Sequence, residues 1–157
     1  MSRVNWKRLQ PNSVREALEL CKDHARERHN LSVQRIADLL QLPDHYTLYK
    51  WLQTGRMPTI VIPAYESACG INLVSRWVAA SAGKLLIDLP TGRKAGVQDV
   101  QQLQEVLLEA TAALMAFYNG KQDADTTLNA IRNAMESLAW HRGNVIQHAQ
   151  PQLELGD

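Results

Sequence analysis

Apolar residues recur at alternating spacings of three and four along most of this chain, and that spacing places them on one side of an α-helix. The repeat is longest in residues 97–149. Its members there are Val100, Leu103, Leu107, Ala110, Leu114, Phe117, Leu128, Ile131, Met135, Leu138 and Val145. Because Asn119-Gly120 interrupts it, the repeat predicts two long helices joined by a short turn, an antiparallel hairpin.

The first half of the chain contains shorter segments with the same spacing, separated by capping and helix-breaking residues. Helices are predicted at about 13–28, 33–40, 45–53, 64–69 and 72–81. Ser32 and Asp44 are good N-caps, because their side-chain oxygens accept from the free N–H groups of a first turn. Gly55 suits a left-handed C-terminal cap. The chain is therefore predicted to be mainly all-α, with a five-helix domain over residues 12–83.

The segment KLLIDLP, residues 84–90, is apolar at nearly every position and too short for a helix, so it predicts one short β-strand at 84–89. The backbone groups of a strand need a partner. Two arrangements stay open, an extended cover over the core or pairing with the same strand of a second copy. The remaining parts are a basic arm at 1–11, a hinge that completes 84–96, and a frayed tail at 150–157.

Charge is unevenly distributed between the two halves. Residues 1–94 contain 14 of the 17 Lys and Arg residues and 8 of the 16 Asp and Glu residues, a net charge of +6. Residues 95–157 contain the other 3 and 8, a net charge of −5. Such an asymmetry is typical of a basic part that binds a polyanion and an acidic part that does not. Chance segregation of charge in a small chain is the alternative.

The sequence favours neither catalysis nor a cofactor. Cys21 and His24 stand three apart, but no second pair of ligands lies nearby, so no metal site is predicted. TGRKAG, residues 91–96, lacks the spacing and the Ser or Thr of a phosphate-binding loop. No signal peptide is evident, and no apolar run approaches the roughly 20 residues that span a bilayer. We expect a cytoplasmic, nucleoid-associated protein of a bacterial host with reduced cysteines and no membrane contact.

Residues 32–53 have the order helix, tight turn, helix that a helix-turn-helix motif needs. Ala37 is small enough for a close crossing of the two helices. At about 100° per residue, Leu48, Trp51 and Leu52 fall on the inner side of the second helix, and its outer side is expected to face a DNA major groove. The predicted DNA-binding residues are Ser32, Gln34, Arg35, His45, Tyr46, Thr47, Tyr49, Lys50, Gln53 and Arg56.

Within this set, Lys50 and Gln53 can hydrogen-bond base edges or phosphates, whereas Ser32 and Gln34 lie where a helix N-terminus binds a phosphate. Further phosphate contacts are expected from Arg35 and Arg56 and, in the arm, from Arg3, Lys7 and Arg8. A polar outer side with one lysine is also typical of any surface helix, and tyrosines there often pack. The helix pattern alone leaves both interpretations open.

A resemblance bears on this choice. Residues 32–79 resemble the λ-repressor-like DNA-binding domain, in which a tryptophan, a glycine and a proline follow the recognition helix, as Trp51, Gly55 and Pro58 do here. ACGIN at 68–72 resembles the ALGVS-like stretch of that family. The wider layout, including SAGKLLIDLP and a helical C-terminal region, is similar to phage regulatory proteins of the CII type.

The chain departs from the family in the turn of the motif, which is one residue longer and has Gln41 in place of the usual glycine. Gln41 is therefore expected to adopt a left-handed backbone, at a cost of about 1 kcal/mol. The resemblance implies a sequence-specific transcription regulator that acts as an oligomer at phage promoters. It implies double-stranded DNA as the ligand, and RNA polymerase is a candidate protein partner. The alternative function is a protein-interaction adaptor or antitoxin-like module whose helix-turn-helix is vestigial.

The hairpin is also apolar on the sides expected to face outward. The residues concerned are Val97, Val106, Ala113, Ala134 and Ala139. Such broad apolar surfaces favour packing against a second hairpin in a four-helix bundle, which predicts a dimer or tetramer through residues 97–149. Packing of the hairpin against the N-terminal domain of the same chain is the alternative.

Overall fold

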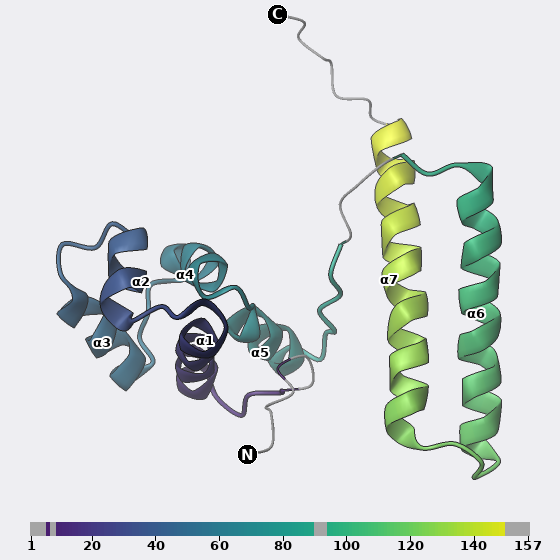
Figure 1. Ribbon diagram of the computed structural model, residues 1–157, viewed down its shortest axis with the longest axis horizontal. Helices are drawn as coiled ribbons and strands as arrows, with labels where there is room; N and C mark the ends of the chain where they lie inside the picture. The colour runs from purple at the N-terminus through teal and green to yellow at the C-terminus, as the bar shows by residue number, and fades with distance from the viewer. Residues whose placement is uncertain (1–5, 7–8, 90–93, 150–157) are drawn as a thin grey trace, which may run out of the picture. The chain divides into compact units, whose positions relative to one another are not determined.

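The computed structural model describes Trp6, residues 9–89 and residues 94–149, and it is mainly helical, as predicted. The secondary structure of these residues consists of seven α-helices and one short 3-10 helix (Figure 1). They fall into two compact units, divided between Leu86 and Ile87. The basic residues Arg3, Lys7 and Arg8, the hinge residues 90–93 and the tail 150–157 lie outside the described residues.

The first unit contains five α-helices and the 3-10 helix. They are α1 (Val14–His29), α2 (Val33–Leu39), α3 (His45–Thr54), η1 (Thr59–Val61), α4 (Ile62–Cys69) and α5 (Leu73–Ser81). Helix α1 contacts α3, α4 and α5, so it is the centre of the unit. Its fully buried residues are Ala17, Leu18, Cys21 and Ala25. These are positions where the sequence repeat predicted an inward side, because side chains three and four apart share one side of a helix.

Two buried polar side chains connect helices across this core. The Tyr65 hydroxyl of α4 donates to the Leu18 carbonyl of α1 at 2.7 Å. The Glu66 carboxylate accepts from the Ser75 N–H at 2.8 Å and from the Ser75 hydroxyl at 2.6 Å. Glu66 therefore satisfies a free N–H group in the first turn of α5, a task that the Asn72 side chain does not perform. All three bonds link residues whose pairing depends on the tertiary fold.

The turn between α2 and α3 has the geometry that the sequence predicted. Gln41 has φ of 53°, so the expected left-handed backbone is confirmed. Its N–H donates to the Asp38 carbonyl, and the Leu42 N–H donates to the Ala37 carbonyl, each at 3.0 Å. These two bonds form a Schellman motif, which ends a helix by satisfying its last carbonyls. The turn thereby stops α2 sharply and directs the chain into α3.

Gly55 determines how α3 leaves the motif. Its φ of 71° is left-handed, and its N–H donates to the Trp51 carbonyl at 2.8 Å. A Cβ atom added to Gly55 would lie 3.3 Å from the Cβ of Arg15 in α1. The absence of a side chain therefore serves both the backbone conformation and the close approach of α3 to α1.

The described part of the N-terminal arm is packed against the first unit. Trp6 and Pro11 are buried, and the indole of Trp6 lies edge-on to the His24 ring with 5.1 Å between centroids. The Arg76 guanidinium of α5 donates to the Leu9 carbonyl at 3.1 Å. The described residues of this arm form no helix, and they belong to the packed first unit.

The predicted β-strand is absent, and this prediction was wrong. Residues 84–89 form neither a helix nor a strand ladder, and no strand occurs in the described residues. Leu85 and Leu89 are 69% and 66% exposed, so the segment does not cover the core of the first unit. A lone extended segment cannot be stable as a strand unless another strand accepts its hydrogen bonds.

The second unit is an antiparallel hairpin of α6 (Val97–Tyr118) and α7 (Ala124–Ala149), as predicted (Figure 1). The Asp123 carboxylate caps α7 by accepting from the Thr126 N–H at 2.8 Å and from the Thr126 hydroxyl at 2.7 Å. The Asp99 carboxylate caps α6 through the Gly96 N–H at 2.7 Å. The amide of Asn144 in α7 accepts from the Ala95 N–H at 2.9 Å, which connects the start of α6 to the end of α7.

The inner and outer sides of the hairpin differ from the prediction. Ala113 and Ala134, expected to face outward, are buried with Ala110 where the helices meet. Leu128 and Leu138, expected to face inward, are 59% and 46% exposed. Small side chains let two helices approach to the lower end of the usual 8–10 Å separation, and a broad leucine stripe cannot turn wholly toward one partner.

Candidate nucleic-acid interface

Helix α3 has an apolar inner side and a polar outer side. Leu48 and Leu52 are 0% and 3% exposed and belong to the core of the first unit. Trp51 packs against this core but remains partly exposed, so it is less buried than predicted. On the other side Lys50 and Gln53 are exposed, and neither side chain has a hydrogen bond or ion pair to any described residue. The outer side is therefore available to a ligand.

Three aromatic rings cluster at the start and middle of this outer side. The half-buried ring of His45 lies 4.3 Å from the ring of Tyr46 and 6.0 Å from the ring of Tyr49, measured between centroids. Tyr46 is 72% exposed and Tyr49 is 49% exposed. Contact with His45 restricts the rotamers of both tyrosines without burying them. Their hydroxyl groups remain able to donate to a phosphate or a base edge.

Two of the predicted contact residues take part in the capping of helices, Ser32 as the cap and Thr47 as a donor to the cap. Ser32 Oγ accepts from the Arg35 N–H at 3.2 Å at the start of α2. Thr47 N–H and Oγ1 both bond to the Asp44 carboxylate at the start of α3, at 2.8 and 3.3 Å. The Ser32 hydroxyl proton is still free to donate, whereas the Thr47 hydroxyl already has an acceptor. The Thr47 hydroxyl is therefore occupied in holding the capping carboxylate of Asp44.

The remaining predicted residues lie at the surface of α2 and directly after α3. Gln34 and Arg35 are exposed in the first turn of α2. Arg56 is exposed just beyond the C-terminal cap of α3, where its N–H bonds to Thr54 Oγ1 at 3.4 Å. The side chains of both arginines make no ion pair with any described residue. Free guanidinium groups beside a recognition helix suit phosphate contacts.

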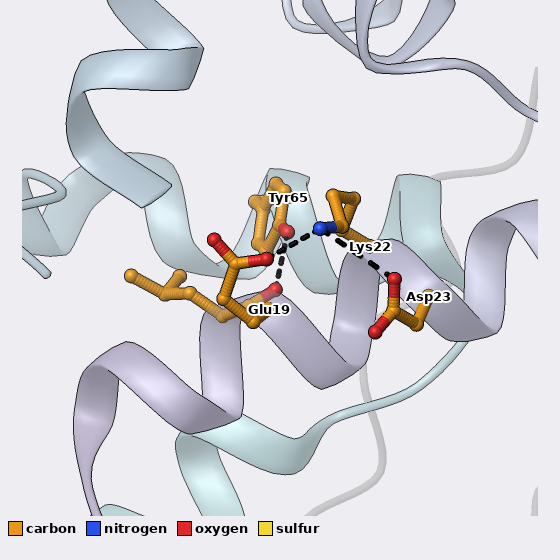
Figure 2. A network of polar contacts seen from close by, with 5 residues as sticks. Glu19, Lys22, Asp23 and Tyr65 are labelled. Atoms are coloured by element: carbon orange, nitrogen blue, oxygen red, sulfur yellow. Dashed lines mark hydrogen bonds and ion pairs between the residues drawn. The ribbon is translucent and has the colours of Figure 1, made fainter. Parts of the chain in front are cut away.

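Sequence reasoning missed two basic residues of α1 that lie beside α3. Arg15, Glu19 and Lys22 line an open hollow of about 340 Å³ together with Tyr49, Leu52 and Gln53. Arg15 is exposed, whereas Lys22 is held between Glu19 and Asp23, with 3.5 Å between the Lys22 ammonium and Asp23 (Figure 2). The residues of α1 and α3 are more than 25 apart in sequence, so no local pattern could have revealed their proximity.

The ion pairs of Lys22 affect its charge. Partial burial by itself would lower the pKa of the Lys22 ammonium, but the hydrogen bond and charge of Glu19, with the charge of Asp23, outweigh it and raise the pKa. Lys22 therefore stays protonated, with its charge compensated within α1. Arg15 is the residue of this hollow whose positive charge remains uncompensated by a described side chain.

The two cysteines lie in the core and not at this surface. Cys21 and Cys69 are free thiols and fully buried. Burial raises the pKa of each thiol to about 12, so neither is a reactive thiolate near neutral pH. Among the described residues, no group of three or more His, Cys, Asp and Glu side chains is placed to hold a metal ion. No described helix combines the length and the apolar character needed to cross a membrane.

Comparison with known proteins does not extend this description. No protein-family model, curated protein or solved structure matches the chain. The candidate interface therefore consists of the exposed side of α3, the N-terminal turn of α2, Arg56 and the neighbouring Arg15 of α1.

Proposed function

We propose that this protein is a sequence-specific DNA-binding transcription regulator of phage or prophage type. In this proposal the first unit is a λ-repressor-like domain that places α3 in the major groove, and the protein acts as a homo-oligomer in the cytoplasm of a bacterial host. The observation that carries the proposal is the arrangement of the two sides of α3. Its inner side is anchored in the core by Leu48 and Leu52, while Lys50 and Gln53 opposite them have no partner in the described chain.

The arrangement around α3 supports this assignment. A recognition helix must be held rigidly, and here the Schellman turn at Gln41, the Asp44 cap and the Gly55 exit determine its two ends. Lys50 suits guanine O6 and N7 or a phosphate, and the Gln53 amide suits adenine N6 and N7. The phosphate contacts come from Arg35 and Arg56.

The charge distribution supports the same proposal. Residues 1–94 carry a net charge of +6, which favours approach to a polyanion. Residues 95–157, with a net charge of −5, are repelled by DNA and remain available for protein contacts. RNA polymerase is one candidate for such a contact, in an activator. The rival function, an adaptor or antitoxin-like module with a vestigial helix-turn-helix, predicts no strong affinity of the first half for DNA.

A salt titration separates these two functions. Binding of the purified protein to random duplex DNA is measured by fluorescence anisotropy between about 50 and 300 mM salt. A regulator that contacts at least three or four phosphates is expected to give a log–log slope of about −3 or steeper, because each contact releases condensed counterions. Weak affinity with a flat salt dependence would favour the adaptor and reject the proposal.

A second measurement tests the recognition helix. An operator is first selected from genomic fragments, and the double variant Lys50→Ala, Gln53→Ala is then compared with the wild type. Loss of two base contacts, each contributing about 1–3 kcal/mol, is expected to lower operator affinity at least 30-fold while random-DNA affinity changes little. The control Lys121→Ala, Gln98→Ala removes the same groups from the second unit and should bind normally. Unchanged operator preference in the first variant would show that α3 is not the recognition helix.

A further inference from the structure

We infer that one broad side of the α6–α7 hairpin is covered by the same side of a second copy of this chain. The two copies pack with opposite ends together, so that the turn between α6 and α7 of one copy lies beside the start of α6 and the end of α7 of the other. This surface, the apolar hairpin face, is formed by Val100 and Leu107 of α6 and by Leu128, Leu138 and Ile146 of α7. These side chains are 36–59% exposed in a single chain. The inference does not depend on DNA binding.

Helix geometry places these residues on one side of the hairpin. Ala110 and Ala113 of α6 face Ala134 of α7 at the line where the helices meet. Val100 and Leu107 lie about a quarter turn around α6 from that line, and Leu128 and Ile146 lie about a third of a turn around α7 in the same rotational sense. Because the helices are antiparallel, rotations in the same sense bring both sets to the same side.

The hairpin needs such a cover. Apart from three alanines, no apolar side chain of the described residues 94–149 is buried. Two helices joined by a turn cannot stabilise themselves with so small a core, since most helical stability in proteins comes from packing of an apolar side. Burying the apolar hairpin face against an identical one creates the core of a four-helix bundle.

The size of the face suits a second copy. Helices of 22 and 26 residues are about 33 and 39 Å long at 1.5 Å per residue. Two helices about 9 Å apart present a surface about 20 Å wide, so a matching hairpin would cover about 650 Å² of each copy. Stable interfaces bury about 800 Å² per partner, and side-chain interdigitation adds to the flat estimate.

The charges of the hairpin determine which ends meet. Glu105, Glu109 and Glu136 project from other sides of the helices, so two copies can meet at the apolar face despite their negative charge. Arg142 lies within the face, one turn from both Leu138 and Ile146. Packing with like ends together would place two Arg142 side chains at the same level of the bundle, whereas packing with opposite ends together separates them by about 16 Å along the helix axes, since Arg142 lies about 8 Å from the middle of α7.

Adjacent leucines of α6 provide a matched test. Leu107 belongs to the apolar hairpin face, whereas Leu108, 71% exposed, lies about 100° further around α6 and points away from α7. Sedimentation and light scattering without DNA are expected to give the wild type a mass of at least twice 17.7 kDa. Leu107→Glu should lower the mass to that of one chain, and Leu108→Glu, with the same change of charge, should leave it unchanged. A monomeric wild type, or equal effects of the two variants, would overturn the inference.

A distance measurement tests the packing without a substitution that disrupts the interface. A spin label at Gln147→Cys marks the exposed end of α7, and the native Cys21 and Cys69 are too buried to be labelled. If the copies pack with opposite ends together, electron–electron double resonance should find the two labels about 30 Å or more apart, since they lie at opposite ends of the bundle. Separations below about 20 Å, or no intermolecular signal, would contradict the proposed packing. Because no DNA is present, either result leaves the DNA-binding proposal to its own tests.

Discussion

At the scale of single residues, Gln41 is the clearest case where sequence and structure agree on an unfavourable conformation. Helices α2, α4 and α5 all end in the same two-bond pattern, and the left-handed residue is Gly70 after α4 and Gly83 after α5 but Gln41 after α2. A side chain in that conformation costs roughly 1–2 kcal/mol, because Cβ crowds the following carbonyl oxygen. The turn that orients α3 is therefore strained at this residue.

Replacing Gln41 with glycine is expected to stabilise the first unit. The relief of crowding at Cβ exceeds the greater entropy of glycine in the unfolded chain, and we expect a gain of up to about 1 kcal/mol in the free energy of unfolding. Urea denaturation followed by circular dichroism measures it. Gln41→Ala is the control, since alanine keeps the Cβ atom and should change little. A destabilised glycine variant would show that the Gln41 side chain contributes more than the strain costs.

Residue types on the outer side of α3 could be predicted from the helix period, but their local contacts could not. The prediction of Tyr46, Lys50 and Gln53 as outward-facing follows from the positions of Leu48 and Leu52. That His45 contacts both tyrosine rings depends on side-chain rotamers, which the sequence period does not specify.

At the scale of elements, helix ends were predictable where the capping side chain lies within one turn of the N–H groups it satisfies. Ser32, Asp44 and Asp123 are such residues. The cap of α5 was not predictable, because its acceptor is Glu66, nine residues before Ser75 and in another helix. A local motif contains its own partner, whereas a cap from another helix requires the tertiary fold.

The Asp123 cap of α7 makes hairpin stability depend on pH. Hydrogen bonds from the Thr126 hydroxyl and N–H lower the pKa of this carboxylate below its usual value near 3.9. A lowered pKa in the folded state means that the stabilisation is present above the unfolded-state pKa and is lost as pH falls through the folded-state pKa. We expect Asp123→Asn to be less stable than the wild type at pH 6, with the difference shrinking as the pH falls below about 3.9.

Thermal unfolding monitored at several pH values measures this difference. Glu109→Gln serves as the control, because that exposed carboxylate caps no helix. A difference between wild type and Asp123→Asn that stayed constant from pH 6 to pH values far below 3.9 would exclude the charged cap as its source.

At the scale of the whole molecule, the two units stabilise themselves differently. The first unit buries large side chains such as Leu18, Leu48, Tyr65 and Leu73 within residues 9–83. The described part of the second buries three alanines, and its large apolar side chains are partly buried or exposed. The first unit therefore has a core of its own, whereas the described part of the hairpin lacks a core of large buried side chains.

Truncation after Gly92 tests this difference. The fragment is expected to unfold cooperatively and to be a monomer, because it keeps the first core and loses the hairpin. Its affinity for a two-site operator should fall at least tenfold, since the second copy is no longer held nearby. Sedimentation, thermal circular dichroism and anisotropy check these expectations. A fragment that fails to fold would show that the first unit needs the hairpin, and one that still dimerises would place the self-association elsewhere.

The sequence by itself determined the helices, the helix-turn-helix order, the left-handed Gln41 and the polar outer side of α3, because each depends on residues within a few positions of one another. Only the tertiary structure decided which side of the hairpin is buried, that residues 84–89 form no strand, and that Arg15 and Lys22 of α1 lie beside Tyr49 and Gln53. These features depend on which surfaces meet. The period of one helix identifies an apolar side, but the partner determines how much of that side is covered.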